Sequence, residues 1–183
     1  NATEITQYLT QRHKTALAGT KSLSEGVIAS LLLSSYCKDN EKINLNIQAS
    51  GWCHQAIFDA NSQAEVRGYV IERNYDDIHL AKDIGPWGIG LLSVLRTKHD
   101  EAKPYIGTVP LLTGHLAKDL TFYWLQSEQV HSAVGIEVHL DFEKNEVTFA
   151  QGFLIQALPG ASEADIQFIE DHMKKLNFLE PDS

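Results

Sequence analysis

Alternation of apolar and polar residues predicts strands along most of the chain. Residues 43–49 place isoleucine, leucine or alanine at every second position, with asparagine and glutamine between them. Residues 134–142 alternate in the same way and carry the clearest strand signal. A period of two is typical of a strand with one face on a core and the other in water. Shorter signals predict further strands over residues 52–60, 65–71, 85–96, 105–109 and 147–158.

Helical spacing of apolar residues predicts the helices between these strands. A helix over residues 23–38 has one apolar face, made of Leu23, Val27, Ile28, Leu31, Leu32 and Tyr36. A second helix carries Leu116, Leu120, Tyr123 and Trp124. In the last helix, Ser162 and Asp165 are spaced to cap the N-terminus, and a narrow stripe is expected to dock on the sheet: Ile166, Ile169, Met173 and Leu176. At the N-terminus we predict a short strand over residues 1–5 and then a short helix ending near Gly19.

The grouping of these elements decides the fold class. The connections between the first three strands are too short for parallel crossovers, so these strands form an antiparallel meander. The strands as a whole are grouped in meanders with helices between the groups. We therefore predict one α+β domain with a mixed, largely antiparallel sheet packed by three or four helices. Gly26 is expected to allow close packing of a helix against a strand, and the glycines of residues 85–90 a bulge or close backbone approach. Gly152 is expected to mark a bulge or bend in its strand.

Charge and hydropathy narrow the classes of partner. The chain has 183 residues, a net charge of -9 and a pI near 5.3. A negative surface repels phosphate backbones and anionic lipids, so we expect neither nucleic acid nor membrane surfaces as partners. No apolar run approaches the roughly 20 residues that a membrane-spanning helix needs.

Candidate chemistry is sparse. The eight histidines are scattered without metal-ligand spacing, and Asp76-Asp77 is more typical of a solvated turn than of a metal site. Cys37 and Cys53 are expected to be reduced, partly buried thiols. His115 and Asp119 lie one helical turn apart and could form an acid/base pair, but an ordinary helix-surface contact explains the spacing equally well. With no nucleophile motif, phosphate loop or dinucleotide fingerprint, we predict no catalytic residue and no enzyme.

Large and charged residues inside apolar motifs need partners. Tyr123, Trp124 and Leu125 are consecutive and cannot share one helix face, so burial beneath neighbouring elements or contact with a partner is expected. Arg67 and Glu128 are predicted to form a partly buried ion pair, because a charge among apolar residues needs an opposite charge.

Five motifs are distributed along the chain. They are V-R-G-Y-V from Val66, G-I-G-L from Gly88, Y-x-G-x-V-x-L-L-x-G from Tyr105, D-L-x-x-Y-x-x-x-S-E-Q-x-x-S from Asp119, and G-F-L-I-Q-A-L-P-G-A from Gly152. They are colinear and cover nearly the whole chain. Their order resembles the 33 kDa chaperonin family, the redox-regulated heat shock holdases of the bacterial cytoplasm.

The resemblance implies an N-terminal core domain over residues 1–180, in a family whose C-terminal domain binds zinc through C-x-C and C-x-x-C thiolates. Cys37 and Cys53 do not match those ligands, so we expect no metal site in this chain and zinc only in the absent switch domain. The expected function is ATP-independent binding of unfolding client proteins by a cytoplasmic homodimer, with a client surface that the sequence does not locate. The alternative is a zinc-less peptide- or ligand-binding module of the same fold.

Nine residues of the quoted motifs are expected to support the scaffold. Gly107 and Gly114 should shape the turn before the helix, while Ser127, Glu128 and Gln129 should anchor the helix exit. The full set is Arg67, Gly68, Gly107, Gly114, Asp119, Tyr123, Ser127, Glu128 and Gln129.

Overall fold

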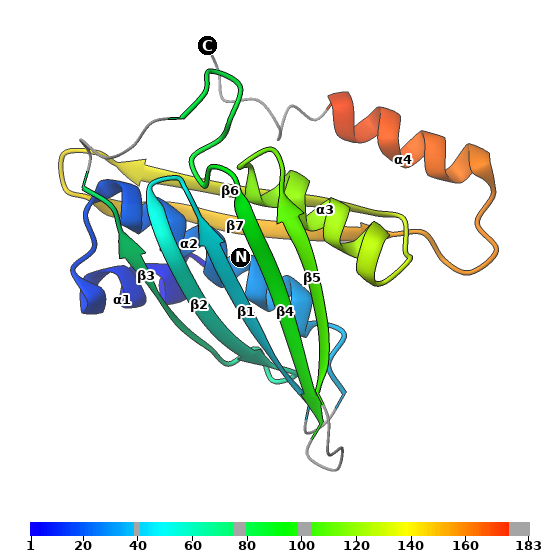
Figure 1. The fold of residues 1–183 in the computed structure, drawn as a ribbon, viewed down its shortest axis with the longest axis horizontal. Coiled ribbons are helices and arrows are strands. Elements are labelled where there is room, and N and C mark those ends of the chain that lie inside the picture. Colours follow the sequence, from blue (N-terminus) through cyan, green and yellow to red (C-terminus); the bar gives the residue numbers. More distant parts are fainter. Residues whose placement is uncertain (39–40, 75–79, 99–103, 176–183) are drawn as a thin grey trace.

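A five-stranded antiparallel sheet forms one side of the molecule (Figure 1). The computed structural model describes residues 1–38, 41–74, 80–98 and 104–175. The strand order is β3-β2-β1-β4-β5 with all neighbours antiparallel, which confirms the predicted meander of the first three strands. The strands are β1 (Glu41–Ala49), β2 (Cys53–Asn61), β3 (Val66–Glu72), β4 (Gly90–Lys98) and β5 (Tyr105–Leu111).

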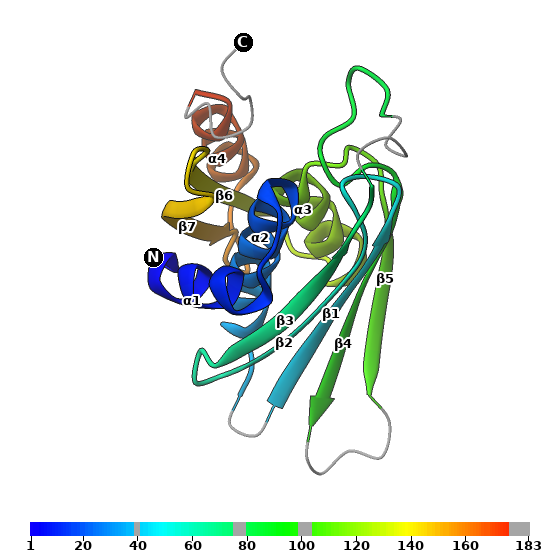
Figure 2. The ribbon, with the colours of Figure 1, turned by 90° about the vertical axis from the view of Figure 1, so that its left-hand side faces the viewer.

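A second sheet lies on the far side of the helices. It is a hairpin of β6 (Ser132–Asp141) and β7 (Glu146–Gln156). Helix α2 (Leu17–Ser34) runs between the two sheets, and α3 (Leu116–Ser127) packs between β5 and β6 (Figure 2). The α+β prediction is confirmed. Helices α2 and α3 form a layer between the five-stranded sheet and the two-stranded sheet.

Helix α2 is buried on more sides than its sequence suggested. It starts six residues earlier than predicted and ends at Ser34, so Tyr36 lies beyond it and is exposed. Leu23, Val27 and Ile28 and the small residues around them are buried, because sheets cover the helix on two sides. The hydroxyls of Ser24 and Ser30 donate to the carbonyls of Thr20 and Gly26, each at 2.8 Å, so burial leaves neither hydroxyl without a partner. A Cβ at Gly26 would lie 2.1 Å from the Phe58 ring, which confirms the predicted close packing against a strand.

The predicted N-terminal strand is wrong. Residues Thr3–His13 form α1, which packs on β7. The amide of Ala2 donates to the carbonyl of Ala150 at 2.8 Å, and Thr6, Leu9 and Thr10 are buried at helical spacing. Two apolar residues among five are too short a pattern to separate a strand from the first turn of a helix.

The small sheet and α4 (Glu163–Lys175) show one correction and one confirmation. The register shift in the β6–β7 hairpin falls between His139 and Leu140, whereas Gly152 pairs directly with Ile136, so no bulge lies at that glycine. A Cβ at Gly152 would lie 2.3 Å from Ile28, so its role is close packing on α2.

The start of α4 has the predicted cap. The amide of Ser162 donates to the Asp165 carboxylate at 3.0 Å, and the Asp165 amide donates to the Ser162 hydroxyl at 3.2 Å. The side chains of Ile169 and Met173, all of Leu176 and the Asp76-Asp77 turn lie outside the described residues, so the docking of the stripe stays a prediction.

Candidate functional site

The carboxylate of Asp119 is a structural hub that accepts main-chain hydrogen bonds from the turn before α3. Its Oδ1 accepts the amides of Leu112 and Thr113 at 3.1 and 3.0 Å, and its Oδ2 accepts the amide of Gly114 at 3.0 Å. The side chain is buried, and Gly114 has a positive φ of 69°, as expected for the turn residue. Three main-chain donors thus hold the carboxylate that was considered for chemistry with His115, whose pKa is lowered mainly by burial.

The C-terminal end of α3 is locked onto β5 and β4. The Tyr123 hydroxyl donates to Glu128 at 2.9 Å, and the Tyr105 hydroxyl donates to the Ser127 carbonyl at 3.0 Å. Burial raises the pKa of Tyr123. Gly107 lies within β5 and not in the turn, and a Cβ there would lie 2.9 Å from the Tyr123 ring. Its bare backbone therefore lets α3 approach the strand.

Residues after Tyr123 complete this end of the helix. Trp124 is buried and Leu125 is exposed, so the three consecutive apolar residues face different ways, as their order required. Gln129 has a positive φ of 56° directly after the helix, where the chain turns toward β6.

The predicted ion pair between Arg67 and Glu128 is wrong. Arg67 lies on edge strand β3 and pairs with its cross-strand neighbour Asp59 at 2.8 Å, whereas Glu128 lies behind β5 and approaches Arg96 at 3.8 Å. The two residues are at opposite edges of the sheet. Arg67 and Glu128 are each close to a different oppositely charged residue, which the spacing of motifs along the sequence could not predict. Gly68 is next to Arg67, and a Cβ there would lie 2.1 Å from Phe58.

A glycine-rich loop joins these clusters to the centre of the molecule. The amide of Gly85 donates to the Thr113 carbonyl and the amide of Gly51 to the Trp87 carbonyl, at 2.8 and 2.9 Å. This is the predicted close backbone approach. The buried Trp87 indole donates to Glu25 of α2 at 2.6 Å, and burial raises the pKa of that carboxyl. Sequence reasoning missed this contact, although Glu25 stands among small and apolar residues of the helix and was a visible signal.

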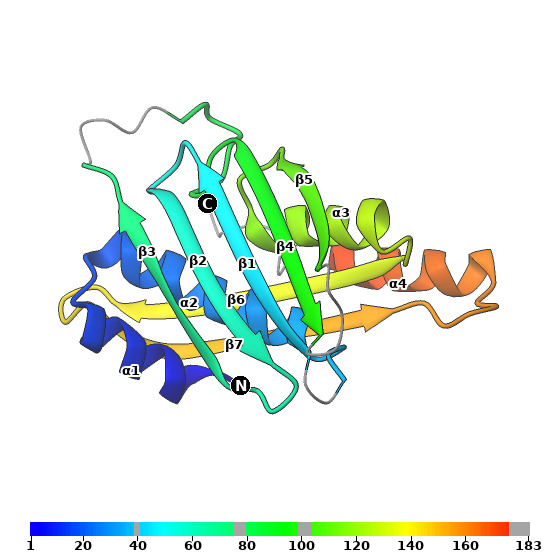
Figure 3. The same cartoon turned by 60° about the horizontal axis from the view of Figure 1, so that its bottom comes forward.

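No described helix covers the outer face of the five-stranded sheet (Figure 3). The register aligns its side chains in rows across the strands, with amides on β1 in the centre and apolar side chains on β4 and β5. Leu91 and Ile106 are 52% and 59% exposed, and Ile89 and Leu112 extend the apolar side. On the other side of the amides, Tyr69 and Ile71 of β3 are also exposed.

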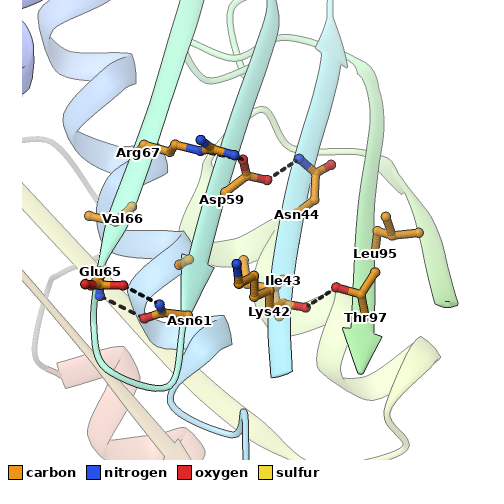
Figure 4. A pocket seen from close by; sticks show the side chains of 11 residues that line it. Lys42, Ile43, Asn44, Asp59, Asn61, Glu65, Val66, Arg67, Leu95 and Thr97 are labelled. Atoms are coloured by element: carbon orange, nitrogen blue, oxygen red, sulfur yellow. Dashed lines mark hydrogen bonds and ion pairs between the residues drawn. The ribbon is translucent and has the colours of Figure 1, made fainter. Parts of the chain in front are cut away.

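A hollow of about 490 Å³ lies at one end of this face (Figure 4). Asn44 donates to Asp59 at 2.9 Å, and Arg67 binds the other side of that carboxylate, so a polar chain crosses three strands. Leu95 and Val66 line the same hollow. The surface therefore offers hydrogen-bonding and apolar groups side by side, with no convergent catalytic set among the residues that line it.

Comparison with known proteins decides the family. The sequence model of the Hsp33 protein family matches residues 1–182. The chain belongs to the Hsp33 family. It is 34% identical over 186 aligned residues to a 33 kDa chaperonin of Levilactobacillus brevis and 32% identical over 180 to one of Streptococcus equi subsp. zooepidemicus. Each comparison covers 96% of this chain and 61% of the relative.

A solved Hsp33 structure supports the same assignment. The crystal structure of the 33 kDa chaperonin from Thermotoga maritima superposes with a TM-score of 0.80 at 28% identity, covering 98% of this chain and 64% of that one. This chain thus spans less than two thirds of the length of these Hsp33 relatives. No helix among the described residues is long and apolar enough to cross a membrane.

The two cysteines of this Hsp33 chain do not fit a zinc site. Cys37 precedes β1 and Cys53 begins β2, at opposite ends of strands that are roughly 25 Å long. Both are buried, and burial raises the pKa of the Cys53 thiol to about 11, so it is held as a neutral thiol. Within the described ranges, no three histidine, cysteine or acidic residues are grouped to hold a metal ion.

Proposed function

We propose that this chain is the core domain of a redox-regulated, ATP-independent holdase that binds unfolding proteins in the cytoplasm under oxidative stress. The observation that carries the proposal is the family match over residues 1–182. In this proposal the zinc-binding switch belongs to the part of the longer protein that residues 1–183 do not include, and the active form is a homodimer. The domain contributes binding surface and no catalysis.

The outer sheet face is the surface that suits unfolded clients. An unfolded chain exposes apolar side chains together with unpaired amides and carbonyls. On the outer face, Leu91 and Ile106 can contact the apolar side chains of a client. The amide side chains of Asn44, Asn46 and Gln48 can bind its unpaired main-chain groups. Apolar and amide side chains are spread in rows over this face, so its contacts do not depend on one side-chain shape and can be shared by many client sequences.

The experiment is suppression of aggregation, followed by light scattering of a heat-unfolded reporter protein. The full-length gene product is assayed oxidised and reduced, with Leu91→Ser/Ile106→Ser as the outer-face variant and Phe142→Ser as control. Phe142 is 75% exposed on the β6–β7 hairpin, so its change removes a comparable apolar group from another surface.

We expect the oxidised wild type and Phe142→Ser to suppress scattering, and the outer-face variant to lose most of that effect. Failure of the oxidised wild type would sink the holdase proposal and favour a binding module that lacks the switch. Full activity of the outer-face variant would leave the holdase in place and remove the outer face as its client surface.

A further inference from the structure

Strand β3 is an edge strand with unpaired main-chain groups. Among the described residues, its one partner strand is β2. The amide of Asn61 donates to the carbonyl of Glu65, so the alternation of an antiparallel pair directs the amides and carbonyls of Val66, Gly68 and Val70 away from β2. Such an edge is a template for one more strand. The other edge is less suitable, because Pro110 of β5 has no amide hydrogen.

Helix α1 forms a second wall opposite this edge. Figure 3 shows α1 running alongside β3, and a groove of about 560 Å³ lies between them. The residues that α1 gives to the groove recur at helical spacing, so one stripe of the helix faces it: Ile5, Tyr8, Leu9, Arg12 and His13. A groove between an edge strand and a helix is a recurring way to bind an extended peptide by strand addition.

The charges of the groove select the kind of peptide. The chain as a whole carries a net charge of -9. The groove reverses this balance, because the guanidinium groups of Arg12 and Arg67 line it against a single carboxylate, Asp59. Arg67 binds Asp59, but the side chain of Arg67 is 83% exposed and remains accessible to a second carboxylate. An acidic segment therefore meets attraction in this groove and repulsion over most of the remaining surface.

We propose that the α1–β3 groove binds an extended segment of another protein, with alternating acidic and apolar residues, as a sixth strand beside β3. Side chains of an added strand alternate between the two faces of the sheet. On the outer face its acidic side chains lie next to Arg67 and within reach of Arg12. On the inner face its apolar side chains lie against Ile5 and Leu9 of α1. This site differs from the outer-face surface around Leu91 and does not depend on holdase activity.

The first test measures peptide affinity by fluorescence polarisation with the purified protein in about 150 mM salt, where charges more than roughly 8 Å apart are screened. The probes are a labelled ten-residue peptide of alternating valine and glutamate and one with lysine in place of glutamate. Arg12→Glu is compared with Lys14→Glu, which makes the same charge change at the same helix end but outside the groove.

We expect the glutamate peptide to bind, the lysine peptide to bind at least tenfold more weakly, and Arg12→Glu to weaken binding about tenfold while Lys14→Glu changes it less than twofold. Equal affinity for the two peptides, absence of binding, or equal effects of the two variants would each overturn the proposal.

The second test locates the added strand by amide hydrogen exchange. Binding of the glutamate peptide should slow exchange at the amides of Val66, Gly68 and Val70, and should leave Arg67 and Tyr69, which are already paired with β2, nearly unchanged. Protection at β5 instead, or pairing of β3 with a second copy of this chain that excludes the peptide, would contradict the assignment. Suppression of reporter aggregation is measured separately. Failure of peptide binding therefore leaves the holdase proposal untouched, and failure of aggregation suppression leaves the groove proposal untouched.

Discussion

The two faces of the five-stranded sheet come from the same strands but carry opposite chemistry. On β1, the inward side chains of Ile43, Leu45 and Ile47 are fully buried under α2, whereas Asn44 and Asn46 between them face outward. The inner face is a packed core closed by helices. The outer face keeps leucine and isoleucine in contact with water on β4 and β5.

This difference shows that folding depends on the inner face, whereas the side chains of the outer face can vary with little effect on stability. A core position is fixed by the volume around it, while an exposed apolar side chain contributes little to folding. Conversely, exposed Leu91 and Ile106 favour association with other molecules. Substitutions on the inner face are therefore expected to lower stability strongly and to change client binding little. Substitutions on the outer face are expected to weaken client binding and to change stability little.

The sharpest contrast lies between two consecutive residues of β1. Leu45→Ala should lower the free energy of unfolding by about 2–5 kcal/mol, because it leaves a cavity in the core. Asn46→Ala, on the outer face, should change it by less than about 1 kcal/mol. Chemical denaturation of both variants measures this. Similar losses would mean that the outer face is also packed in solution.

The next effect concerns the polar hub beside the core. Asp119→Ala leaves the amides of Leu112, Thr113 and Gly114 without their acceptor and should cost about 3 kcal/mol. Asp141→Ala is the matched control, because Asp141 also accepts two main-chain amides but in an exposed turn, and its effect should be much smaller. Thermal unfolding compares the two, and an equally small loss for Asp119→Ala would remove the hub from the account.

A smaller effect depends on pH. Burial raises the pKa of Glu25 above 4.5, so the folded state holds a proton that the unfolded state releases. The contribution of this group is therefore fully present below pH 4.5 and is lost as the pH rises through the raised pKa of the folded state. Glu25→Gln should flatten the fall in stability in that window, whereas exposed Glu4→Gln should not. Denaturation series across pH would show the same slope for all three proteins if Glu25 were not involved.

The smallest stability effect is expected on the outer face. Leu91→Ser/Ile106→Ser should change the free energy of unfolding by less than about 1 kcal/mol, because both side chains are mostly exposed. A loss comparable with that of Leu45→Ala would show that these residues belong to the folded core, and would weaken their assignment to client binding.

The sequence was most informative where a pattern was long. The alternation on β1 and β6 and the spacing on α3 identified these elements because one face of each meets a core. It failed at residues 1–5, where the pattern was too short. It identified α2 but placed its start six residues too late, because layers on two sides remove the usual polar face. Contacts between distant residues were the hardest to foresee: Arg67 with Asp59 and Glu25 with Trp87 depend on the register of strands and the path of a loop.

The most direct measurement of the central claim places a photo-crosslinking residue at Leu91 on the outer face or at Phe142 on the small sheet of the full-length protein. Both positions are exposed, so the comparison concerns location alone. With an oxidised sample and a heat-unfolded reporter, the account predicts strong crosslinks from position 91 and few from position 142. Equal yields, or crosslinks mainly from position 142, would contradict the outer face as the client surface.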